Sequence, residues 1–382
     1  MNNKKQYQIC TICVMDTTDP EINFDENGVC NHCREFDEVT SKRWFPNEEG
    51  TKKLEAIYEK MKKENANKEY DCILGLSGGV DSSYLALKLY EAGIRPLLVH
   101  VDGGWNSELA VQNIENIVNY CGWHLHTIVI DWEEMKDLQL AYLKSAIANQ
   151  DVPQDHAFFA SLYHFATKYG VNYVISGGNL ATESIFPKAW EGDAMDSTNL
   201  LAIQKKFGIK KLKKYKTVSF FEYYFYYPFI KKMKVIRPLN FMPYIKREAL
   251  QELKDKVGYK EYARKHGESV FTKFFQNYYQ PKKFGYDKRK PHLSSLIVTG
   301  QMTREEALKE LEKSLYDEKE LKQDVEYFCK KLGISNIEFD NIMNAKIHTF
   351  DDFQNNKAKY ILMKKLQNFI MRVFNKNLAN YS

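Results

Sequence analysis

The residues best suited to chemistry are Ser77-Gly78-Gly79-Val80-Asp81-Ser82. Two adjacent glycines let the backbone approach an anion closely, and the first N–H groups of a following helix would point at that anion with the positive end of the helix dipole. Ser77 and Ser82 add hydroxyl donors. A carboxylate repels a bare phosphate, so Asp81 fits here only if it holds a Mg²⁺ that bridges phosphate oxygens. The loop is therefore predicted to cradle phosphates, although a tight turn capped by Asp81 or Ser82 would use the same residue types.

Four cysteines near the amino terminus form a second chemical pattern. Cys10-Thr-Ile-Cys13 and Cys30-Asn-His-Cys33 are two Cys-x-x-Cys pairs separated by sixteen residues. Two turns at this spacing can present four thiolates in a tetrahedron, which leaves no open position on the metal and predicts a structural Zn²⁺. A redox pair or a disulfide is the alternative interpretation. His32 lies inside the second pair, where we expect it to support the ligands or face solvent.

The elements that must position the loop are read from hydrophobic periodicity. Residues 70–92 read as a buried strand, a glycine turn and an amphipathic helix. Further strands are expected at 96–102, 124–131 and 171–175. Helices are expected at 107–120, 132–149 and 154–169. This alternation predicts an α/β fold with a doubly wound parallel sheet, whose ligands bind outside the carboxyl ends of the strands.

Polar residues and glycines follow several of these strand ends. They are Asp102-Gly103-Gly104-Trp105-Asn106, Asp131, and Gly177-Gly178-Asn179. We expect these ends to converge with Ser77–Ser82 on one nucleotide-binding crevice. Gly, Asp and Asn are also ordinary turn residues, which is the competing explanation.

The rest of the sequence predicts mostly helices around this sheet. Residues 41–68 and 239–266 are helical in pattern, 282–290 reads as a loop, and Thr303-Arg-Glu-Glu306 is a capping box that opens a helical carboxyl-terminal region. We expect a zinc knuckle at 1–40, a helical linker at 41–68, a nucleotide-binding domain at 69–240 and a helical region with a basic substrate loop at 241–382.

Composition limits the classes of function. The 382 residues are 44% hydrophobic and carry a net charge of +5, so a strong electrostatic hold on nucleic acid is not required. We expect no membrane span and no signal peptide, and hence a cytoplasmic protein. Residues 209–237 interleave lysines with aromatic rings, a pattern that can stack nucleic-acid bases but more often covers a site or forms an interface.

The hexapeptide Ser77–Ser82 resembles the PP-loop of the N-type ATP pyrophosphatases, which cleave ATP between its α and β phosphates. It lacks the spaced glycines and the Lys-Ser/Thr ending of a Walker A loop. The resemblance implies an adenine-nucleotide alpha-hydrolase-like fold that uses ATP and Mg²⁺. It places Asp81, Ser77 and Ser82 in the catalytic site, with Gly78, Gly79, Val80 and Asp102 around the nucleotide. Leu76 and Val101 would then lie beside the adenine, and Gly177 would allow close approach.

A later block, Lys283-Phe-Gly-Tyr-Asp-Lys-Arg-Lys-Pro-His-Leu-Ser-Ser-Leu-Ile-Val-Thr-Gly-Gln-Met-Thr-Arg304, narrows the resemblance. Together with the PP-loop and the tetracysteine knuckle, it is similar to the N-acetyl sugar amidotransferases of bacterial surface-polysaccharide (lipopolysaccharide O-antigen) biosynthesis, from Cys10 to about Leu311. The resemblance implies conversion of an acetamido group on a sugar or sugar nucleotide to an acetamidino group. Candidate contacts to a sugar diphosphate or pyrophosphate are Lys283, Lys288, Arg289, His292 and Arg304.

Two further functions stay open on the sequence alone. One is a tRNA-modifying PP-loop enzyme, although Cys72, Cys121 and Cys329 form no Cys-x-x-Cys for sulfur transfer. The other is an ATP-sensing or scaffold protein without turnover. If the chain is an amidotransferase, it contains no recognisable glutaminase, so ammonia must come from a separate glutaminase with a cyclase-like barrel subunit. The surface between Lys210 and Lys234 is the predicted docking face for that partner.

Overall fold

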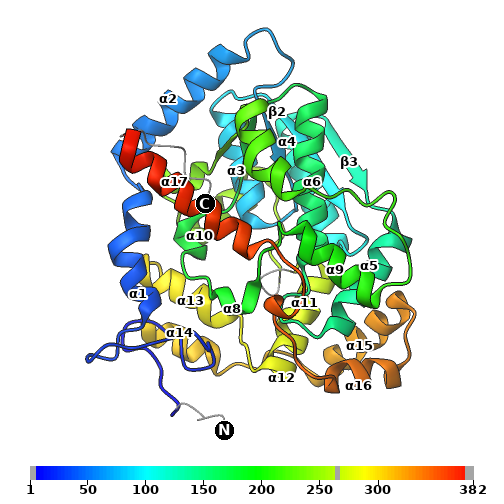
Figure 1. The fold of residues 1–382 in the computed structure, drawn as a ribbon. Helices are drawn as coiled ribbons and strands as arrows, with labels where there is room; N and C mark the ends of the chain where they lie inside the picture. Colours follow the sequence, from blue (N-terminus) through cyan, green and yellow to red (C-terminus); the bar gives the residue numbers. More distant parts are fainter. Residues whose placement is uncertain (1–5, 263–266, 375–382) are drawn as a thin grey trace.

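The fold is described from a computed structural model that covers residues 6–262 and 267–374, with side chains of the last helix described as far as 368. Its strands are β1 (Cys72–Gly75), β2 (Pro96–Asp102), β3 (Leu125–Val129), β4 (Tyr173–Ile175) and β5 (Lys234–Ile236). They form one sheet in the order β3-β2-β1-β4-β5, and every neighbouring pair is parallel. The predicted doubly wound α/β fold is confirmed (Figure 1).

Helices surround this sheet. Those before β4 are α1 (Asn31–Glu35), α2 (Glu48–Glu64), α3 (Val80–Glu91), α4 (Glu108–Cys121), α5 (Trp132–Ser145) and α6 (Val152–Lys168). Between β4 and α10 lie α7 (Leu180–Glu183), α8 (Lys188–Glu191), α9 (Ser197–Phe207) and the π-helix η3 (Glu222–Ile230). The carboxyl-terminal set is α10 (Lys246–Val257), α11 (Val270–Phe274), α12 (Gln280–Phe284), α13 (Arg289–Val298), α14 (Arg304–Leu311), α15 (Glu318–Leu332), α16 (Asn336–Asn344) and α17 (Lys357–Phe374).

The two faces of the sheet are covered by different helices because strand side chains alternate in direction. Cys72 and Leu74 of β1 pack into a core with residues of α2, α3, α4 and α10. Ile73 points the other way, into a core with α6 and η3. Short buried strands with helices on both sides are what the apolar runs at 72–76 and 96–101 require.

The helix predicted as a linker packs on the main core. Leu54, Tyr58 and Met61 lie on one stripe of α2, and all three are buried against α3 and β1 residues. Asn47 caps this helix by accepting a hydrogen bond from the Gly50 amide at 3.0 Å.

Several local predictions were wrong. Strand β5 was not predicted, because only three residues pair with β4 and none of them is fully buried. Residues 258–262 are not helical, while 263–266 lie outside the described residues. The segment expected to be a loop, 282–290, contains the end of α12 and the start of α13, and only 285–288 connects them.

Candidate functional site

The turn between β1 and α3 requires glycine at Gly78. Its φ is +84°, and a Cβ built there would lie 2.7 Å from the carbonyl oxygen of Ala110. Gly79 is the N-cap residue of α3, and no side chain caps this helix. The alternative of a turn capped by Asp81 or Ser82 is therefore excluded, and the backbone donors of the first helical turn remain available to an anion.

The two serines of the loop lie together. Their hydroxyl oxygens are 3.1 Å apart, and the Ser77 amide donates to Ser82 Oγ at 3.3 Å. Ser77 Oγ also accepts from the Gly79 amide at 3.2 Å, and Ser82 Oγ donates to the Gly79 carbonyl at 3.2 Å. These hydrogen bonds join Ser77, Gly79 and Ser82 to one another and so fix the conformation of the loop.

The end of β4 meets the loop, as the sheet order requires. A Cβ on Gly177 would lie 3.4 Å from the Ser82 amide nitrogen, so glycine permits this close approach. Leu76 is fully buried, and Val101 is half-buried near the end of β2. Asp102 accepts a hydrogen bond from the Gly104 amide at 2.7 Å. The structure thus places the predicted nucleotide residues at the carboxyl ends of β1, β2 and β4.

Three tyrosines that the sequence did not single out hold the loop from the carboxyl-terminal side. Tyr244 donates a hydrogen bond to Asp81 Oδ1. Tyr259 and Tyr262 both donate to the Gly78 carbonyl at 2.9 Å. Burial raises the pKa of Tyr244 well above its ordinary value, and the negative charges of Asp81 and Glu183 raise it further. The charge of Glu183 acts on the phenol bound to Asp81, so a second carboxylate belongs to this region.

Glu268 brings the carboxyl-terminal region to the loop. Its backbone carbonyl accepts from the Ser107 amide at 2.9 Å, and Val270 donates to the Trp105 carbonyl at 2.9 Å. A Cβ on Gly79 would lie 3.4 Å from Glu268 Oε1. The segment that opens the carboxyl-terminal helices therefore borders the phosphate loop directly.

Three of the five basic residues predicted to bind substrate are engaged elsewhere. Lys283 donates to the carbonyls of Ile342, Met343 and Ala345 and so caps α16. The Arg289 guanidinium binds Asp287 and the carbonyls after α14, and Arg304 donates to the carbonyls of Cys10 and Cys13. His292 is half-buried on α13. These positions give Lys283, Arg289 and Arg304 structural contacts in place of the predicted ligand contacts.

Lys288 differs, because it enters a buried polar network near the strand ends. It forms an ion pair with Glu191, whose side chain and carbonyl accept from Asn149 Nδ2 at 3.3 and 3.0 Å. Asn149 Oδ1 accepts from the Asp151 amide at 2.9 Å, and Asp151 Oδ1 accepts from Gln154 at 2.8 Å. A Cβ on Gly103, just after β2, would lie 3.6 Å from Gln154 Oε1. The network therefore reaches from α13 to the carboxyl end of β2.

Burial has the largest effect on the pKa values of Lys288 and Asp151 in this network. It lowers the pKa of Lys288 to about 8, although Asp151, Glu183 and Asp155 oppose that change. Burial and the Asp155 charge raise the pKa of Asp151 well above its ordinary value, against hydrogen bonds from Thr272 and Gln154. A carboxyl and an amine with pKa values moved toward neutrality are suited to proton transfer.

We expect Lys288→Met to lower the free energy of unfolding by about 3 to 5 kcal/mol, because it leaves the buried Glu191 carboxylate unpaired. The double variant Lys288→Met with Glu191→Gln should recover most of that loss. Urea unfolding of the four proteins in the cycle measures both values. Equal losses in the single and double variants would contradict a paired role for Lys288.

The four predicted zinc ligands are buried and lie together. Their sulfur atoms are all within 4.8 Å of one another, with Cys10 to Cys33 at 3.9 Å and Cys13 to Cys30 at 3.7 Å. A tetrahedron with Zn–S bonds of about 2.3 Å has S···S edges of about 3.8 Å, so the donor set fits Zn²⁺. The backbone amides of Ile12 and Cys30 donate hydrogen bonds to Cys10 Sγ, and such donors stabilise a thiolate that binds a metal. His32 pairs with Asp19 at 2.7 Å and is not part of the cluster.

The knuckle packs on α13 and α14, as Figure 1 shows for the blue amino-terminal segment. Val14 donates to Ser294 Oγ at 3.2 Å, Lys290 pairs with Asp16, and Arg304 binds the carbonyls of both cysteines of the first pair. The basic residues of the predicted substrate block thus hold the knuckle on the carboxyl-terminal helices. Within the described residues, no helix is both long and apolar enough to span a membrane.

The protein has an α/β fold with a glycine turn between β1 and α3, and comparisons with known proteins show what it resembles. Residues 268–367 match the family model for the C-terminal domain of WbpG-like LPS biosynthesis proteins. The predicted relation to surface-polysaccharide biosynthesis is thus confirmed for this part of the chain, which begins at the Glu268 contact with the loop. The comparison with curated proteins finds no match.

Solved structures that resemble the chain include NMN synthetase from Francisella tularensis, with 15% identity, a TM-score of 0.36 and coverage of 78% of this chain and 97% of that chain. NAD+ synthetase from Burkholderia pseudomallei has 16% identity and a TM-score of 0.29, with coverage of 59% and 95%. NH3-dependent NAD synthetase from Campylobacter jejuni has 16% identity and a TM-score of 0.28, with coverage of 41% and 72%. These scores are too low to support a function.

Proposed function

We propose that this protein is an ATP-dependent amidotransferase that converts an acetamido group of a sugar or sugar nucleotide to an acetamidino group. The observation that carries the proposal is the contact between an uncapped PP-loop and the segment that opens the WbpG-like domain, at Gly79 and Glu268. That contact supports the proposal, because the loop predicted to bind phosphate lies beside a segment similar to the C-terminal domain of WbpG-like LPS biosynthesis proteins.

ATP suits the loop because the amides that begin α3 at 80–82 have no side-chain cap and the two serine hydroxyls lie beside them. Asp81 would hold Mg²⁺, with the Tyr244 phenol donating to its carboxylate. The ion would neutralise charge on the departing pyrophosphate. The four cysteines would hold a structural Zn²⁺.

An amide needs activation before an amine can replace its oxygen. The acetamido oxygen attacks the α-phosphorus of ATP, a P–O bond to pyrophosphate breaks, and an O-adenylyl imidate forms. Ammonia then adds to the activated carbon, loses a proton, and AMP departs with the former amide oxygen to leave the amidine. The chain's own contribution is to position both reactants and to supply donors where negative charge develops.

Two of the five predicted substrate contacts, His292 and Lys288, remain candidates, and we single out Lys288. It lies beside carboxylates rather than among free donors, so it is better suited to move a proton than to bind a bare diphosphate. Asp151, held by Gln154 and Thr272, is the matching candidate acceptor of a proton from the attacking nitrogen.

Ammonia is proposed to come from a partner glutaminase through a cyclase-like barrel subunit. The predicted docking face between Lys210 and Lys234 stays a prediction: its first lysines lie beside the carboxyl end of β3, and its aromatic part lies further along α6. Lys210 and Lys214 pair with Glu133 and Asp131, and the aromatic part of the segment packs along α6 toward the start of β5. His164, which contacts this part, lies twelve residues into α6, roughly 18 Å along the axis from its amino-terminal end.

A sulfur-transferring tRNA enzyme is less well supported. Cys72, Cys121 and Cys329 are all buried on separate elements. Burial raises the pKa of each thiol, to about 12 for Cys121. A persulfide carrier needs an accessible thiolate, which none of the three supplies.

The test is mass spectrometry after incubation with ATP, Mg²⁺, ammonium chloride and a panel of N-acetylated sugar nucleotides. We expect one sugar to lose about one mass unit, since NH replaces oxygen, with AMP and pyrophosphate formed in equal amounts. Glutamine should not replace ammonium chloride for the isolated chain. Formation of ADP and orthophosphate, or modification of tRNA in place of a sugar, would contradict the proposal.

A further inference from the structure

An exposed ridge of aromatic rings runs along η3. Phe221 and Phe225 have ring centroids 5.7 Å apart, and Phe225 and Phe229 have centroids 6.4 Å apart. The ridge continues through Phe220 and Tyr224, which are 4.7 Å apart. Because rings that pack on each other at the surface still leave their outer edges in water, this ridge is a contiguous apolar patch.

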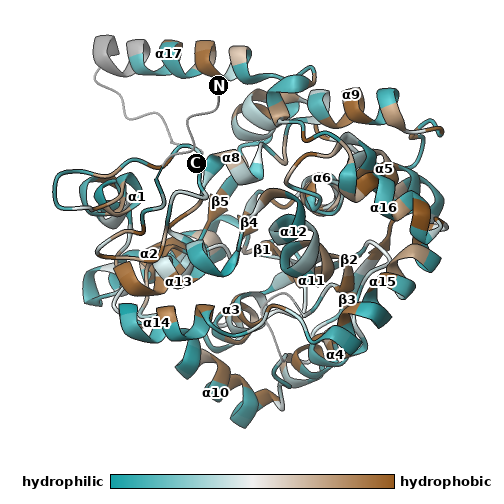
Figure 2. Ribbon diagram, turned by 90° about the horizontal axis from the view of Figure 1, so that it is seen from below, coloured by the Kyte–Doolittle hydropathy of each residue, from teal (hydrophilic) through white to brown (hydrophobic). Residues whose placement is uncertain are grey.

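Helix α17 extends the same surface from a distant part of the sequence. The ring of Tyr360 lies 5.7 Å from that of Tyr224, and Asn356 fixes the start of the helix by hydrogen bonds to Asp196 and Thr198. Met363 is buried. Figure 2 shows α17 standing at the edge of the molecule.

Several apolar side chains of both elements face water. Those that are more than half exposed are Phe221 (64%), Phe229 (55%), Ile230 (67%), Leu362 (69%) and Leu366 (57%). We call these residues, with Phe225 and Ile361, the exposed apolar face. Exposed apolar side chains in such numbers mark sites that bind a partner or a membrane.

The charged residues around this face are mostly lysines. Segments 216–234 and 357–368 together contain eight lysines and one acidic residue, Glu222, whereas the whole chain has 55 basic and 50 acidic residues. Lys231, Lys232, Lys359 and Lys365 are exposed beside the apolar side chains. The complement of such a surface is anionic.

The residue types in the exposed apolar face indicate whether a protein or a membrane binds there. The cores of protein interfaces are depleted in lysine, while helices that lie on membranes combine lysine with phenylalanine and leucine. A lysine can keep its ammonium group among headgroups while neighbouring apolar side chains enter the acyl boundary. The composition of the face therefore matches a lipid surface better than a protein.

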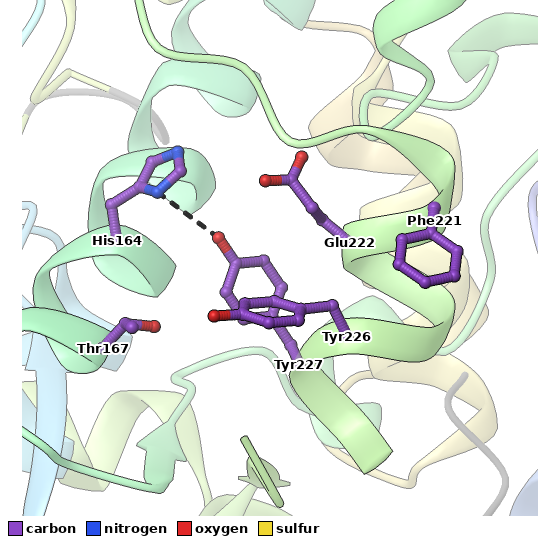
Figure 3. Close-up of a pocket in the computed structure, with 6 residues that line it drawn as sticks. All are labelled: His164, Thr167, Phe221, Glu222, Tyr226 and Tyr227. Carbon is purple, nitrogen blue, oxygen red and sulfur yellow. Dashed lines mark hydrogen bonds between the residues drawn. The ribbon is translucent and has the colours of Figure 1, made fainter. Parts of the chain in front are cut away.

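A hollow of about 280 Å³ opens between α6 and η3 next to Phe221 (Figure 3). It is lined by Thr167, Glu222, Tyr226 and two residues joined by a hydrogen bond, Tyr227 and His164, at 3.4 Å. Carboxylate and hydroxyl groups beside an apolar ridge can pair with the amine and hydroxyl groups of lipid headgroups. The hollow thus adds polar contacts at the border of the apolar face.

We propose that the exposed apolar face and its lysines dock this protein on the surface of an anionic lipid bilayer. The helices lie on the membrane and do not cross it. The Ser77–Ser82 loop follows β1, and none of its residues belongs to this face. Membrane docking does not depend on the reaction proposed above, and each can fail without the other.

Flotation of the full chain with lipid vesicles tests the proposal. We expect binding to vesicles of phosphatidylglycerol and phosphatidylethanolamine, little binding to phosphatidylcholine alone, and loss of binding at high salt. Lys359→Glu with Lys365→Glu should weaken binding about tenfold or more, since each lysine near an anionic surface counts about fivefold. Leu362→Ser with Leu366→Ser should also release the protein.

The matched control is Ile337→Ser with Ile347→Ser, two exposed isoleucines away from this face, which should bind vesicles like the wild type. Circular dichroism checks that each variant keeps its fold. Absence of binding to anionic vesicles at low salt would overturn the proposal. So would equal effects of the control pair, or a dimer by light scattering that Leu362→Ser with Leu366→Ser converts to a monomer, since the face would then bind a second copy.

Discussion

Asp81→Asn is expected to abolish formation of the amidine while leaving the fold intact. Asparagine has the same shape, and its amide oxygen can still accept the hydrogen bond from Tyr244. It carries no charge, so it is a much weaker ligand for Mg²⁺. Loss of one group that stabilises developing charge typically costs about 10² to 10³ in rate, and we expect at least about 10³ here because the ion goes with it.

Release of AMP and pyrophosphate measures this effect directly. Asp317→Asn is the matched control, since Asp317 is exposed and caps α15 through the Lys319 and Glu320 amides at 3.0 and 3.1 Å. Asparagine is an equally good N-cap residue, so this variant should keep full activity and stability. If Asp81→Asn retains activity, or if both variants lose it equally, the assignment of Asp81 is wrong.

The part of the site that the sequence predicts is the part encoded in consecutive residues. Strand, glycine turn and helix follow one another from 72 to 91, and the strand order then brings Gly177 to Ser82. Buried strands with apolar runs are recognisable because both faces of a parallel sheet are covered. The four cysteines are also recognisable from the sequence, because the two residues of each Cys-x-x-Cys pair are close together in the chain.

The remaining contacts depend on tertiary structure. Tyr244 is 163 residues from Asp81, and nothing in its neighbourhood distinguishes it from the other tyrosines of the chain. Lys283 and Arg304 were expected to bind oxyanions, but their partners are backbone carbonyls of α16 and the knuckle. Carbonyl groups at helix ends and turns also accept hydrogen bonds from lysine and arginine, and sequence does not show where these ends lie.

Loss of zinc is expected to have the largest effect on stability. The segment up to about residue 40 has only short elements, so its order depends on the four thiolates. Structural zinc contributes on the order of 10 kcal/mol to folding of such segments. In Cys30→Ser the knuckle should unfold and lose its contacts with Lys290 and Ser294 of α13 and with Arg304 of α14.

Elemental analysis should find about one zinc per wild-type chain and none in Cys30→Ser, which should also be less soluble and cut by trypsin before α2. Cys121→Ser changes a buried thiol outside the cluster, so it should keep its zinc and lose only about 1 to 3 kcal/mol of stability. Comparing Cys30→Ser with Cys121→Ser distinguishes the effect of losing the metal from the effect of losing a buried thiol. A wild-type protein without zinc, or a Cys30→Ser variant as stable as Cys121→Ser, would show that the knuckle is held by its protein contacts alone.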